Sequence, residues 1–306
     1  MKLGTVAADG RQRVAVALDD AHAVLLAPGV TVAGLLGDWA TAREAVSRSV
    51  ADGADEAVPV AGLSWLPPLP RPGKVICVAL NNSANASRIM SGPAHPATFL
   101  KPASSLLGHG RPIRLKKEFG RVHPEPELAV VIGAGGADIG RDDAMRHVFG
   151  YTIINDLTSP TMRAQDTFHY RAIHPAKASH PDGQGDGIEY VDTWVSYSGR
   201  YKGSDGFGPM GPWIATADSF DGTDTRVRCW VNGELRQDAQ TTDFIFDIPT
   251  LIETCSRGIT LYPGDLIATG TPPGVGLGMK PPSFLKSGDV VRIEIDGLGA
   301  IENRFA

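Results

Sequence analysis

The sequence predicts an α+β protein that is rich in β-strands, with a small N-terminal α/β domain and a larger second domain. The first observation is the glycine and proline content: 36 plus 23 residues make 59 of 306, about 19%, where roughly 12% is usual. The second is a series of short segments rich in β-branched residues, which favour strands. The third is a proline-rich segment at 65–73 that separates the two parts. Together these features indicate many turns and short strands, and they exclude a helical bundle.

The proline-rich segment marks the predicted domain boundary. It carries four prolines within the six positions 67–72. Because proline fixes φ and removes a backbone donor, the segment cannot be helical and is typical of a semi-rigid connector. We therefore expect a small N-terminal domain over residues 1–70 and a second domain over residues 71–306.

The N-terminal domain is expected to combine short strands with helix. Strand-like runs lie at 14–18 and 23–26, and apolar residues at helical spacing follow at 35–39. Residues 41–44, Thr-Ala-Arg-Glu, have the form of a capping box. This motif predicts that a second helix starts there.

The second domain is expected to consist mostly of strands. Asn232-Gly233 lies between two strand-like runs, and this dipeptide is typical of a tight β-hairpin. The strands rich in β-branched residues are expected at 74–80, 127–133, 150–155, 227–231 and 290–295.

Helices and long loops complete the expected second domain. Helices are predicted at 142–148 and at 247–256, where a proline occupies the first turn and a glycine follows the last. The stretches 82–98 and 164–200 are irregular in pattern. Because structureless loops of that length in a compact domain usually serve a site, we expect lids or binding loops there.

Composition and charge exclude several classes of protein. A hydrophobic content of 42% with 21% charged residues is that of a globular chain. A formal net charge of -5 gives no electrostatic reason to expect a nucleic acid or an anionic membrane as partner. The longest run without a polar or charged side chain, 128–137, falls well short of the ~18–20 residues that cross a bilayer. We therefore expect no membrane-spanning segment.

A cytoplasmic location is expected. The N-terminus reaches Asp9 and Arg11 before a signal-peptide core could form. The cysteines, Cys77, Cys229 and Cys255, are odd in number and widely spaced. This favours a reducing compartment and neither a disulfide framework nor a zinc site.

The clearest chemical feature is a pair of carboxylates at the start of an apolar strand. Glu125 and Glu127 are two residues apart, so in a strand both side chains point to the same face. A second apolar strand, 151–155, is followed by Asp156. Three acids at the mouths of two strands can form a hard oxygen site for Mg²⁺, Mn²⁺ or Ca²⁺. Taken alone, a Glu-x-Glu motif at a strand start is more often solvated surface, so the surrounding sequence has to decide.

That surrounding sequence resembles the fumarylacetoacetate hydrolase family from residue 74 to residue 306. Seven blocks occur in the family's order, and the N-terminal match is weaker. The blocks are 74–81 (KVICVALN), 99–102 (FLKP), 125–133 (EPELAVVIG), 150–156 (GYTIIND), 202–213 (KGSDGFGPMGPW), 231–237 (VNGELRQ) and 263–276 (PGDLIATGTPPGVG), followed by Gly288-Asp289.

The resemblance implies a mixed β-roll of several short sheets, usually a homodimer, with a metal at one end. The implied metal ligands are Glu125, Glu127 and Asp156, completed by water and substrate oxygens. Lys202 is implied to stabilise a developing enolate or oxyanion electrostatically. Gln237 and Thr271 are implied to hold the substrate, Thr271 at its carboxylate end.

Two departures from the family pattern affect the expected active site. Family hydrolases carry a histidine and a glutamate that activate the attacking water, and these positions are Asn85 and Arg88 here. An amide cannot take a proton from water near pH 7, so the usual base is absent, and Arg88 is expected to bind an anionic substrate. The family arginine that faces a substrate carboxylate is Pro160 here, and Arg163 is the residue expected to compensate.

A third departure is the length of chain between Asp156 and Lys202, which is nearly twice the usual family separation. We expect the additional segment, 164–200, to act as a second lid and to provide His169 or His174 as the substitute proton-transfer group. Two alternatives stay open: these are ordinary loop histidines, or the segment makes a dimer contact.

The resemblance implies a metal-dependent enzyme that acts on a small oxo-acid, in the catabolism of aromatic compounds. The first hypothesis is hydrolysis of a carbon–carbon bond in a 1,3-dicarbonyl or acylpyruvate-like 2-oxo acid through a metal-bound enolate, with Mg²⁺ or Mn²⁺ as cofactor. The alternative is an isomerase or decarboxylase of a 2-hydroxy-dienedioate or oxaloacetate-like substrate, which needs proton transfer but no attacking water. A degenerate member that binds a ligand without turnover is the third hypothesis.

Overall fold

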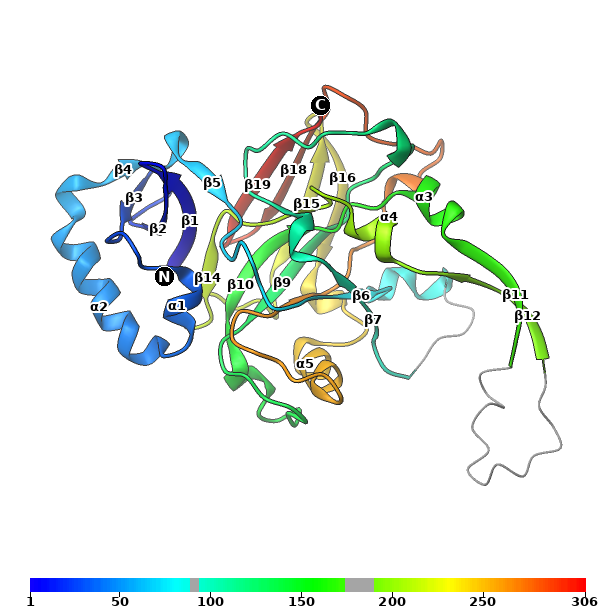
Figure 1. Cartoon of the computed structure of the whole chain (residues 1–306), viewed down its shortest axis with the longest axis horizontal. Coiled ribbons are helices and arrows are strands. Elements are labelled where there is room, and N and C mark those ends of the chain that lie inside the picture. The colour runs from blue at the N-terminus through cyan, green and yellow to red at the C-terminus, as the bar shows by residue number, and fades with distance from the viewer. Residues whose placement is uncertain (89–93, 174–189) are drawn as a thin grey trace.

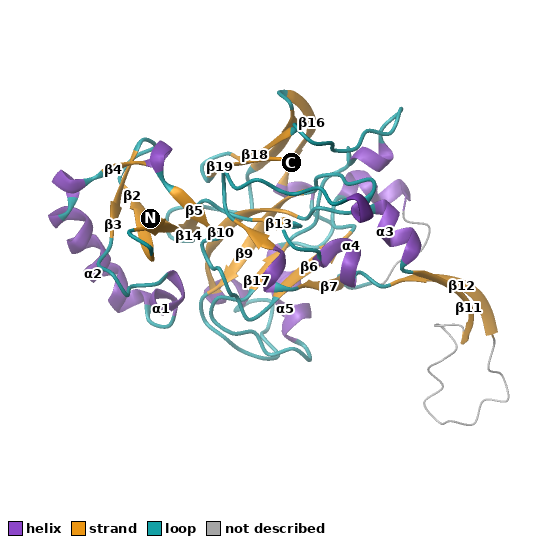
Figure 2. Ribbon diagram, turned by 45° about the horizontal axis from the view of Figure 1, so that its top comes forward, coloured by secondary structure: helices purple, strands orange, loops and turns teal. Residues whose placement is uncertain are grey.

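The computed structural model describes residues 1–88, 94–173 and 190–306, and Figures 1 and 2 show a mixed, sheet-rich fold. One sheet of eleven strands runs in the order β4-β3-β2-β1-β14-β10-β9-β17-β6-β7, with β5 paired to β1. Its strands are β1 (Lys2–Ala8), β2 (Arg11–Ala17), β3 (His22–Leu25), β4 (Val58–Pro59), β5 (Ser64–Leu66), β6 (Val75–Ala79), β7 (Ala97–Lys101), β9 (Pro126–Ile132), β10 (Val148–Asn155), β14 (Ile214–Thr216) and β17 (Leu266–Ala268). The predicted α+β, β-rich class is confirmed.

In the described residues, three smaller sheets accompany the large one. A four-stranded sheet has the order β16-β15-β18-β19, β13 pairs with β8, and β11 pairs with β12. Their bounds are β8 (Leu106–Leu107), β11 (Thr167–Ile173), β12 (Tyr190–Ser196), β13 (Gly208–Pro209), β15 (Arg226–Val231), β16 (Glu234–Gln240), β18 (Val290–Ile295) and β19 (Gly299–Arg304).

The helices are short. The α-helices are α1 (Val32–Leu36), α2 (Trp39–Asp52), α3 (Pro160–Gln165), α4 (Gly199–Gly203) and α5 (Ile248–Ser256). The 3₁₀ turns are η1 (Ala54–Glu56), η2 (Val60–Gly62), η3 (Ser83–Arg88), η4 (Ala103–Ser105), η5 (Lys117–Phe119), η6 (Ala144–His147), η8 (Thr241–Asp243) and η9 (Gly276–Gly278). Within the described residues, no helix combines the length and the apolarity that crossing a membrane requires.

Strand β9 is buried along its whole length because the large sheet is covered on both faces. Leu128, Val130 and Ile132 belong to the core cluster shared with β15, β18, β19 and α5. Ala129 and Val131 belong to the cluster shared with β1, β2 and the N-terminal helices. The continuous apolar run of this strand is therefore the pattern of a strand buried on two sides, and it holds the glutamates at its start in a fixed position.

Strand β1 joins the N-terminal strands to the rest of the large sheet. Lys2 pairs with Ala215 and Leu3 pairs with Ile214 in β14. The N-terminal strands and α2 lie together at one end of the molecule, blue in Figure 1. One sheet thus continues across the boundary proposed near residue 70.

Two local predictions are confirmed in detail. The turn between β15 and β16 has φ of 53° at Asn232 and 81° at Gly233, the left-handed conformation that a tight hairpin of this type requires. Helix α5 begins after Asp247, whose side chain accepts a hydrogen bond from the Thr250 amide, and a proline lies in its first turn.

Two predicted helix starts are wrong. Helix α2 begins at Trp39, because the Asp38 carboxylate accepts a hydrogen bond from the Thr41 amide and caps the helix three residues before the proposed capping box. The helix predicted at 142–148 is only the short turn η6. Val148 instead starts β10 and pairs with Ile132 of β9, because its apolar side chain is buried there.

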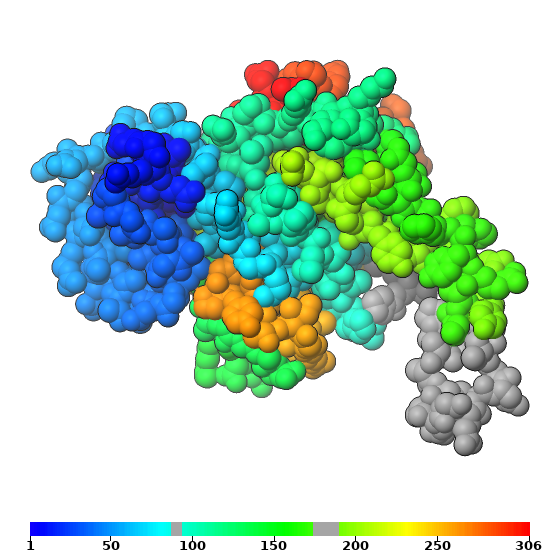
Figure 3. All heavy atoms as spheres, viewed as in Figure 1, coloured from blue at the N-terminus to red at the C-terminus, as the bar shows by residue number. Residues whose placement is uncertain are grey.

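The described parts of the segment 164–200, residues 164–173 and 190–200, are not irregular loop. Strands β11 and β12 pair in register, from Thr167 opposite Ser196 to Ile173 opposite Tyr190. The two strands form a ribbon that leads away from the body of the molecule in Figures 1 and 2, and Figure 3 shows it standing out from the surface. We call β11, β12 and the adjoining Tyr197 the arm.

Candidate metal centre

A cavity of about 320 Å³ lies where β6 and β10 end and β9 begins, beside Phe99 of β7. Helices α3 and α4 and the loop after β17 complete its wall. One part of the wall is apolar, with Val78, Phe99 and Val275, and the other part carries the acidic residues predicted from the sequence. Elements from distant parts of the chain therefore build one site.

The three carboxylates predicted to bind metal come together in this cavity. One oxygen from each of Glu125, Glu127 and Asp156 lies within 4.8 Å of the others. The pairing of β9 with β10 causes this, since β10 ends beside the start of β9 and Glu127 pairs with Ile154. The Asp156 amide donates to the Glu125 carbonyl at 2.9 Å, and the Glu125 amide donates to the side chain of Asn155 at 3.0 Å.

Two lysines hold these carboxylates. Lys202, on α4, places Nζ 2.7 Å from Oε2 of Glu125 and also bonds Asp156. Lys101, the last residue of β7, places Nζ 2.6 Å from Oδ1 of Asp156 and also donates to the Lys202 carbonyl. Sequence reasoning missed Lys101: it belongs to the FLKP block, but only the tertiary fold shows what it contacts.

The charges in the cavity shift the pKa values of its groups in opposite directions. Burial, Asp156 and Glu125 together raise the pKa of Glu127 well above its usual range. Burial also acts to raise the pKa of Glu125, but Lys202 and His123 outweigh it and hold that pKa well below its usual range. Burial acts to lower the pKa of Lys202, but Asp156 and Glu125 outweigh it and raise that pKa, so this side chain stays charged.

The residues present fit a divalent cation. Three carboxylates supply the hard oxygen ligands that Mg²⁺ and Mn²⁺ prefer. Three carboxylates face two lysines, so the lysines do not compensate all of the negative charge, and a divalent cation would do so. Glu125, Glu127 and Asp156 are the residues that would hold it.

The loop after β17 fixes Glu127 from the far side. The Gly270 amide donates to Oε2 of Glu127 at 2.8 Å. Gly270 has a φ of +98°, and a Cβ there would lie 2.8 Å from the Cβ of Asn81, so a side chain does not fit. The Asn81 amide group in turn donates to the Thr269 carbonyl at 2.8 Å. Gly270 is therefore a positioning residue. It belongs to the sequence block 263–276, but the sequence did not reveal its contact with Glu127.

Thr271 and Gln237 occupy different places. Thr271 lies on the cavity wall, whereas Gln237 lies behind it and is 2% exposed. Nε2 of Gln237 donates to Oγ1 of Thr271 at 3.1 Å and to the Pro272 carbonyl at 2.8 Å. Oγ1 of Thr271 accepts this bond and donates to the Pro272 carbonyl at 3.5 Å. In this geometry Gln237 supports Thr271 and does not face the cavity itself.

Three residues that replace or compensate family residues line the same cavity: Asn85, Pro160 and Arg163. Asn85 is buried and lines it. Pro160 and Arg163 line it from α3. Arg88 ends η3, but its side chain is outside the described part of the structure. His123 also lines the cavity and makes a 3.1 Å contact from Nε2 to Oε1 of Glu125.

Of the two histidines proposed as substitute bases, His169 does not line the cavity. His169 lies in β11, exposed, with its ring stacked on Trp194 at 4.2 Å between centroids, and it is not on the cavity wall. The expectation that the 164–200 segment walls the cavity is wrong for the described strands, because β11 and β12 pair with each other and lead outward. His174 lies outside the described residues.

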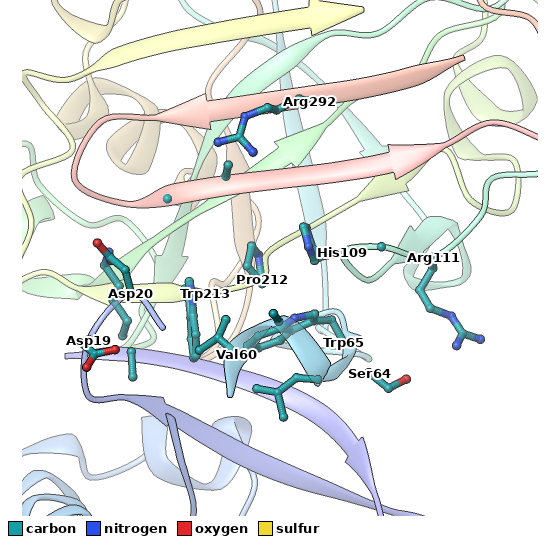
Figure 4. A pocket seen from close by; sticks show the side chains of 17 residues that line it. Asp19, Asp20, Val60, Ser64, Trp65, His109, Arg111, Pro212, Trp213 and Arg292 are labelled. Atoms are coloured by element: carbon teal, nitrogen blue, oxygen red, sulfur yellow. The ribbon is translucent and has the colours of Figure 1, made fainter. Parts of the chain in front are cut away.

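A second, larger cavity of about 570 Å³ lies elsewhere, between the N-terminal strands and the loop around His109 (Figure 4). Trp65 and Trp213 meet edge to face at its floor, 4.6 Å between ring centroids. Its walls contain none of the three clustered carboxylates. Size therefore does not identify the candidate metal centre, whose three carboxylates lie in the smaller cavity.

The fold and the smaller cavity define a β-rich protein with an acidic candidate metal centre beside buried lysines. Residues 74–306 match the family model described as "Fumarylacetoacetate (FAA) hydrolase C-terminal". The chain belongs to the fumarylacetoacetate hydrolase family. The resemblance seen in the sequence blocks is thereby confirmed.

Relatives with different named reactions are similar to this chain. Oxaloacetate tautomerase YisK of Bacillus subtilis is 38% identical over 244 residues, 78% of this chain and 71% of the relative. A fumarylacetoacetate hydrolase from psychrophilic Exiguobacterium antarcticum has a TM-score of 0.78 and 32% identity, covering 100% of this chain and 99% of that one. Maleylpyruvate hydrolase from Sphingobium sp. SYK-6, solved with manganese(II) and pyruvate, has a TM-score of 0.74 and 29% identity, with 100% and 99% covered. The family therefore includes both proton-transfer and hydrolytic enzymes.

Proposed function

We propose that this protein is a metal-dependent tautomerase or isomerase of a 2-oxo dicarboxylic acid, such as an oxaloacetate-like or 2-hydroxy-dienedioate substrate. The observation that carries the proposal is the cavity itself. It combines three carboxylates and a charged Lys202 with Asn85, at the position where family hydrolases carry their water-activating histidine. An enolate can form and be stabilised in such a cavity, but the histidine that family hydrolases use to activate water is missing from position 85.

Lys202 is the residue we assign to stabilise the enolate. We assign His123, on the same cavity wall, to accept the proton removed from the carbon next to the carbonyl of a 2-oxo acid and to return it to the product. Removal of this proton places negative charge on the carbonyl oxygen. Nζ of Lys202 is a fixed positive charge at the mouth of the carboxylate cluster, on a side chain 11% exposed. Its raised pKa keeps it protonated, so it donates hydrogen bonds to developing negative charge and does not accept the proton.

The charge around the cavity favours a substrate with two carboxylates. Three carboxylates face two lysines, so a divalent cation leaves the centre with one positive charge. Arg163 adds another positive charge on the cavity wall, and no carboxylate within the described residues forms an ion pair with it. A dianion balances this arrangement, with one end near the centre and Thr271 and the other end near Arg163.

The metal supports this assignment through its chemistry. When bound, Mg²⁺ or Mn²⁺ supplies a Lewis acid that favours negative charge on the carbonyl oxygen. The similar maleylpyruvate hydrolase was solved with manganese(II) and pyruvate, which supports Mn²⁺ and a 2-oxo acid as the first ligands to test. Tautomerases at 36–38% identity support proton transfer as the reaction.

Hydrolysis of a carbon–carbon bond in an acylpyruvate-like substrate is the second candidate. The similarity to the maleylpyruvate hydrolase, which covers the whole chain, favours it. In that case the attacking water has to be activated without a histidine at position 85, and the dependence of turnover on pH would differ from that of a histidine base.

One experiment separates the two candidates. The protein is assayed with Mg²⁺ or Mn²⁺ on oxaloacetate and a 2-hydroxy-dienedioate, following the enol absorbance, and on maleylpyruvate, fumarylpyruvate and an acylpyruvate, following pyruvate release. We expect fast interconversion of the enol and keto forms and little pyruvate release. Efficient pyruvate release without accelerated interconversion would replace the proposal by hydrolysis.

Two controls complete the assay. Chelation by EDTA should abolish the reaction, and restoring Mn²⁺ should recover it. Lys202→Met should lose turnover, whereas Lys117→Met, at an exposed position of η5, should keep it. No activity on either set of substrates, with Mn²⁺ bound, would support the hypothesis of a ligand-binding protein without turnover.

A further inference from the structure

The larger cavity, of about 570 Å³, is built by two parts of the chain (Figure 4). The N-terminal strands and η2 form one side, and the loop 109–111, the segment 212–213 and the strands β18 and β19 form the other. Its volume lies within the roughly 300–1,000 Å³ of small-molecule sites, which often occur where two parts of a protein meet. The proposed function makes no use of this cavity.

One end of the cavity carries three hydrogen-bond donors. They are the Ser64 hydroxyl, the His109 ring and the Arg111 guanidinium, and Figure 4 shows all three beside Trp65. Within the described residues, the side chains of Ser64 and Arg111 make no hydrogen bond and no ion pair. Lys2 adds a positive charge to the same wall, and no carboxylate of the described chain pairs with it. These groups are therefore available to an acceptor in the cavity.

The hydrogen of the His109 ring lies on Nε2. Nδ1 accepts a hydrogen bond from the Glu302 amide at 3.0 Å, so in the neutral ring Nε2 is the donor. Burial lowers the pKa of His109 below its ordinary value, which keeps the ring neutral near pH 7. This ring therefore donates to a ligand and cannot accept from one.

The backbone at this end is fixed before any ligand binds. Asn303, which is 3% exposed, donates to the carbonyls of Gly108 and Arg111 at 3.0 Å and 2.9 Å. A Cβ at Gly108 would overlap the backbone of Trp65, so the loop that carries His109 packs directly on β5. A ligand therefore has little backbone to order, which favours binding.

The middle of the cavity is apolar. Trp65 and Trp213 form its floor, and the half-buried Val60 and Leu63 pack against the same cluster. An apolar surface with a few convergent polar groups is the usual composition of a small-molecule site. The cavity thus suits a ligand that has an apolar body and one polar end.

The charges of the cavity are separated along its length. Asp19 and Asp20 lie at the end opposite Arg111 in Figure 4. Asp19 accepts hydrogen bonds from two amides of its own turn, each at 2.7 Å. Arg292, above the middle, forms an ion pair with Glu294 at 2.7 Å. The end with Arg111 is therefore the end that attracts an anion.

We propose that this cavity binds a small organic carboxylate with a flat apolar body, at a site separate from the acidic centre. The carboxylate accepts hydrogen bonds from Ser64, His109 and Arg111, and the apolar body lies over Trp65 toward Val60. Arginine suits this role because its planar guanidinium can bond both oxygens of a carboxylate.

The test uses calorimetry on the full chain with Mn²⁺, and 2-naphthoate is the probe. The neutral 2-naphthamide should bind about 10–100-fold more weakly, since it loses the charge-assisted hydrogen bonds. Arg111→Gln should weaken 2-naphthoate binding by a similar factor. Arg114→Gln is the matched control, because Arg114 is exposed, forms no ion pair in the described chain and is absent from the cavity wall. Equal binding of the acid and the amide would overturn the proposal.

Two further variants locate the probe. Ala61→Trp, at an exposed position of the cavity wall, should fill the cavity and abolish binding. Glu127→Gln should bind 2-naphthoate as the wild type does, and a loss in this variant would place the probe in the metal centre instead. Inorganic phosphate should bind at least ~10-fold more weakly than 2-naphthoate, because it buries no apolar surface. Equal affinity for phosphate would contradict a site for an organic carboxylate.

A second measurement is independent of the variants. The chain has five tryptophans, and labelling with 5-fluorotryptophan gives each a fluorine resonance. 2-Naphthoate should shift the resonance of Trp65 or Trp213 and leave those of Trp194 and Trp230 in place. Shifts confined to the other tryptophans, or no binding by the wild type up to millimolar probe, would overturn the proposal.

Discussion

Lys101 and Asp156 form an ion pair inside the wall of the cavity, with Nζ 2.6 Å from Oδ1 and side chains 0% and 2% exposed. The two residues are 55 positions apart in the chain. Asp156 is also bonded by Lys202 through its other oxygen, so a single carboxylate receives both lysines of the site. This arrangement makes the position of Asp156 depend on β7 and on α4 at once.

Lys101→Met tests the contribution of this pair. Removing one partner of a buried ion pair costs about 3–5 kcal/mol, so the free energy of unfolding should fall by about that amount in metal-free protein. With saturating Mn²⁺ the loss should be smaller, because the cation then compensates Asp156. Urea denaturation with and without Mn²⁺ measures both values. An equal loss in the two conditions would show that the lysine acts on packing alone.

Glu127→Gln tests the metal centre. Because burial and the neighbouring carboxylates raise the pKa of Glu127, cation binding should release a proton from this group. Affinity for Mn²⁺ should therefore increase as pH rises and decrease as pH falls. Calorimetry in two buffers of different ionisation enthalpy measures the proton release.

The glutamine variant should lose more than roughly 100-fold in Mn²⁺ affinity, since changes to residues that only support ligands already cost 10–100-fold. It should also lose the proton release. Glu118→Gln, at an exposed position, is the control and should bind as the wild type does. Unchanged Mn²⁺ affinity in Glu127→Gln would remove this residue from the metal centre.

Lys202→Met should lower kcat by roughly 10²–10³-fold, the usual effect of removing one group that stabilises an oxyanion. The Michaelis constant should change much less, because the charge that this lysine meets develops in the transition state. Steady-state kinetics with Mn²⁺ in excess separate the two parameters. A change confined to the Michaelis constant would place the lysine in substrate binding only.

Asn85→Ala should leave kcat within about tenfold of the wild type. Asn85 lies on the cavity wall and is 6% exposed, but its amide cannot serve as a general base, a role whose loss costs 10²–10⁴-fold. A loss of ~10⁴-fold in this variant would contradict the assignment of Asn85 as a wall residue. Arg88 is expected to bind an anionic substrate, so Arg88→Ala should act mainly on the Michaelis constant for such a substrate.

Arg163→Gln should raise the Michaelis constant for a 2-oxo dicarboxylate and leave kcat nearly unchanged. The guanidinium lies on the cavity wall without an ion-pair partner in the described chain, and a charge-assisted hydrogen bond is typically worth about 1.5–3 kcal/mol. A 2-oxo monocarboxylate is the matched substrate and should show no such change. Equal effects on both substrates would exclude recognition of the distal carboxylate.

The local elements of this fold were predictable because their signals lie within a few residues. The apolar run after Glu127 defines β9, and the left-handed pair Asn232-Gly233 defines the turn between β15 and β16. Asp247 caps α5 through a contact only three residues away. The clustering of Glu125, Glu127 and Asp156 was also predictable, since two same-face acids and one strand end belong to adjacent strands.

Contacts between distant segments were decided only by the tertiary structure. The Gly270 amide reaches Glu127 across 143 positions, and Gln237 reaches Thr271 from behind the cavity wall. His169 is separated from the carboxylates because β11 pairs with β12, although the sequence places it between Asp156 and Lys202. Sequence pattern determines which residues prefer a strand and which side of it they occupy, whereas the partner of each strand is chosen by the packing of the whole chain. Local sequence therefore determined the acidic centre. Long-range pairing decided the positions of its lysines, of its supporting glycine and of the exposed arm.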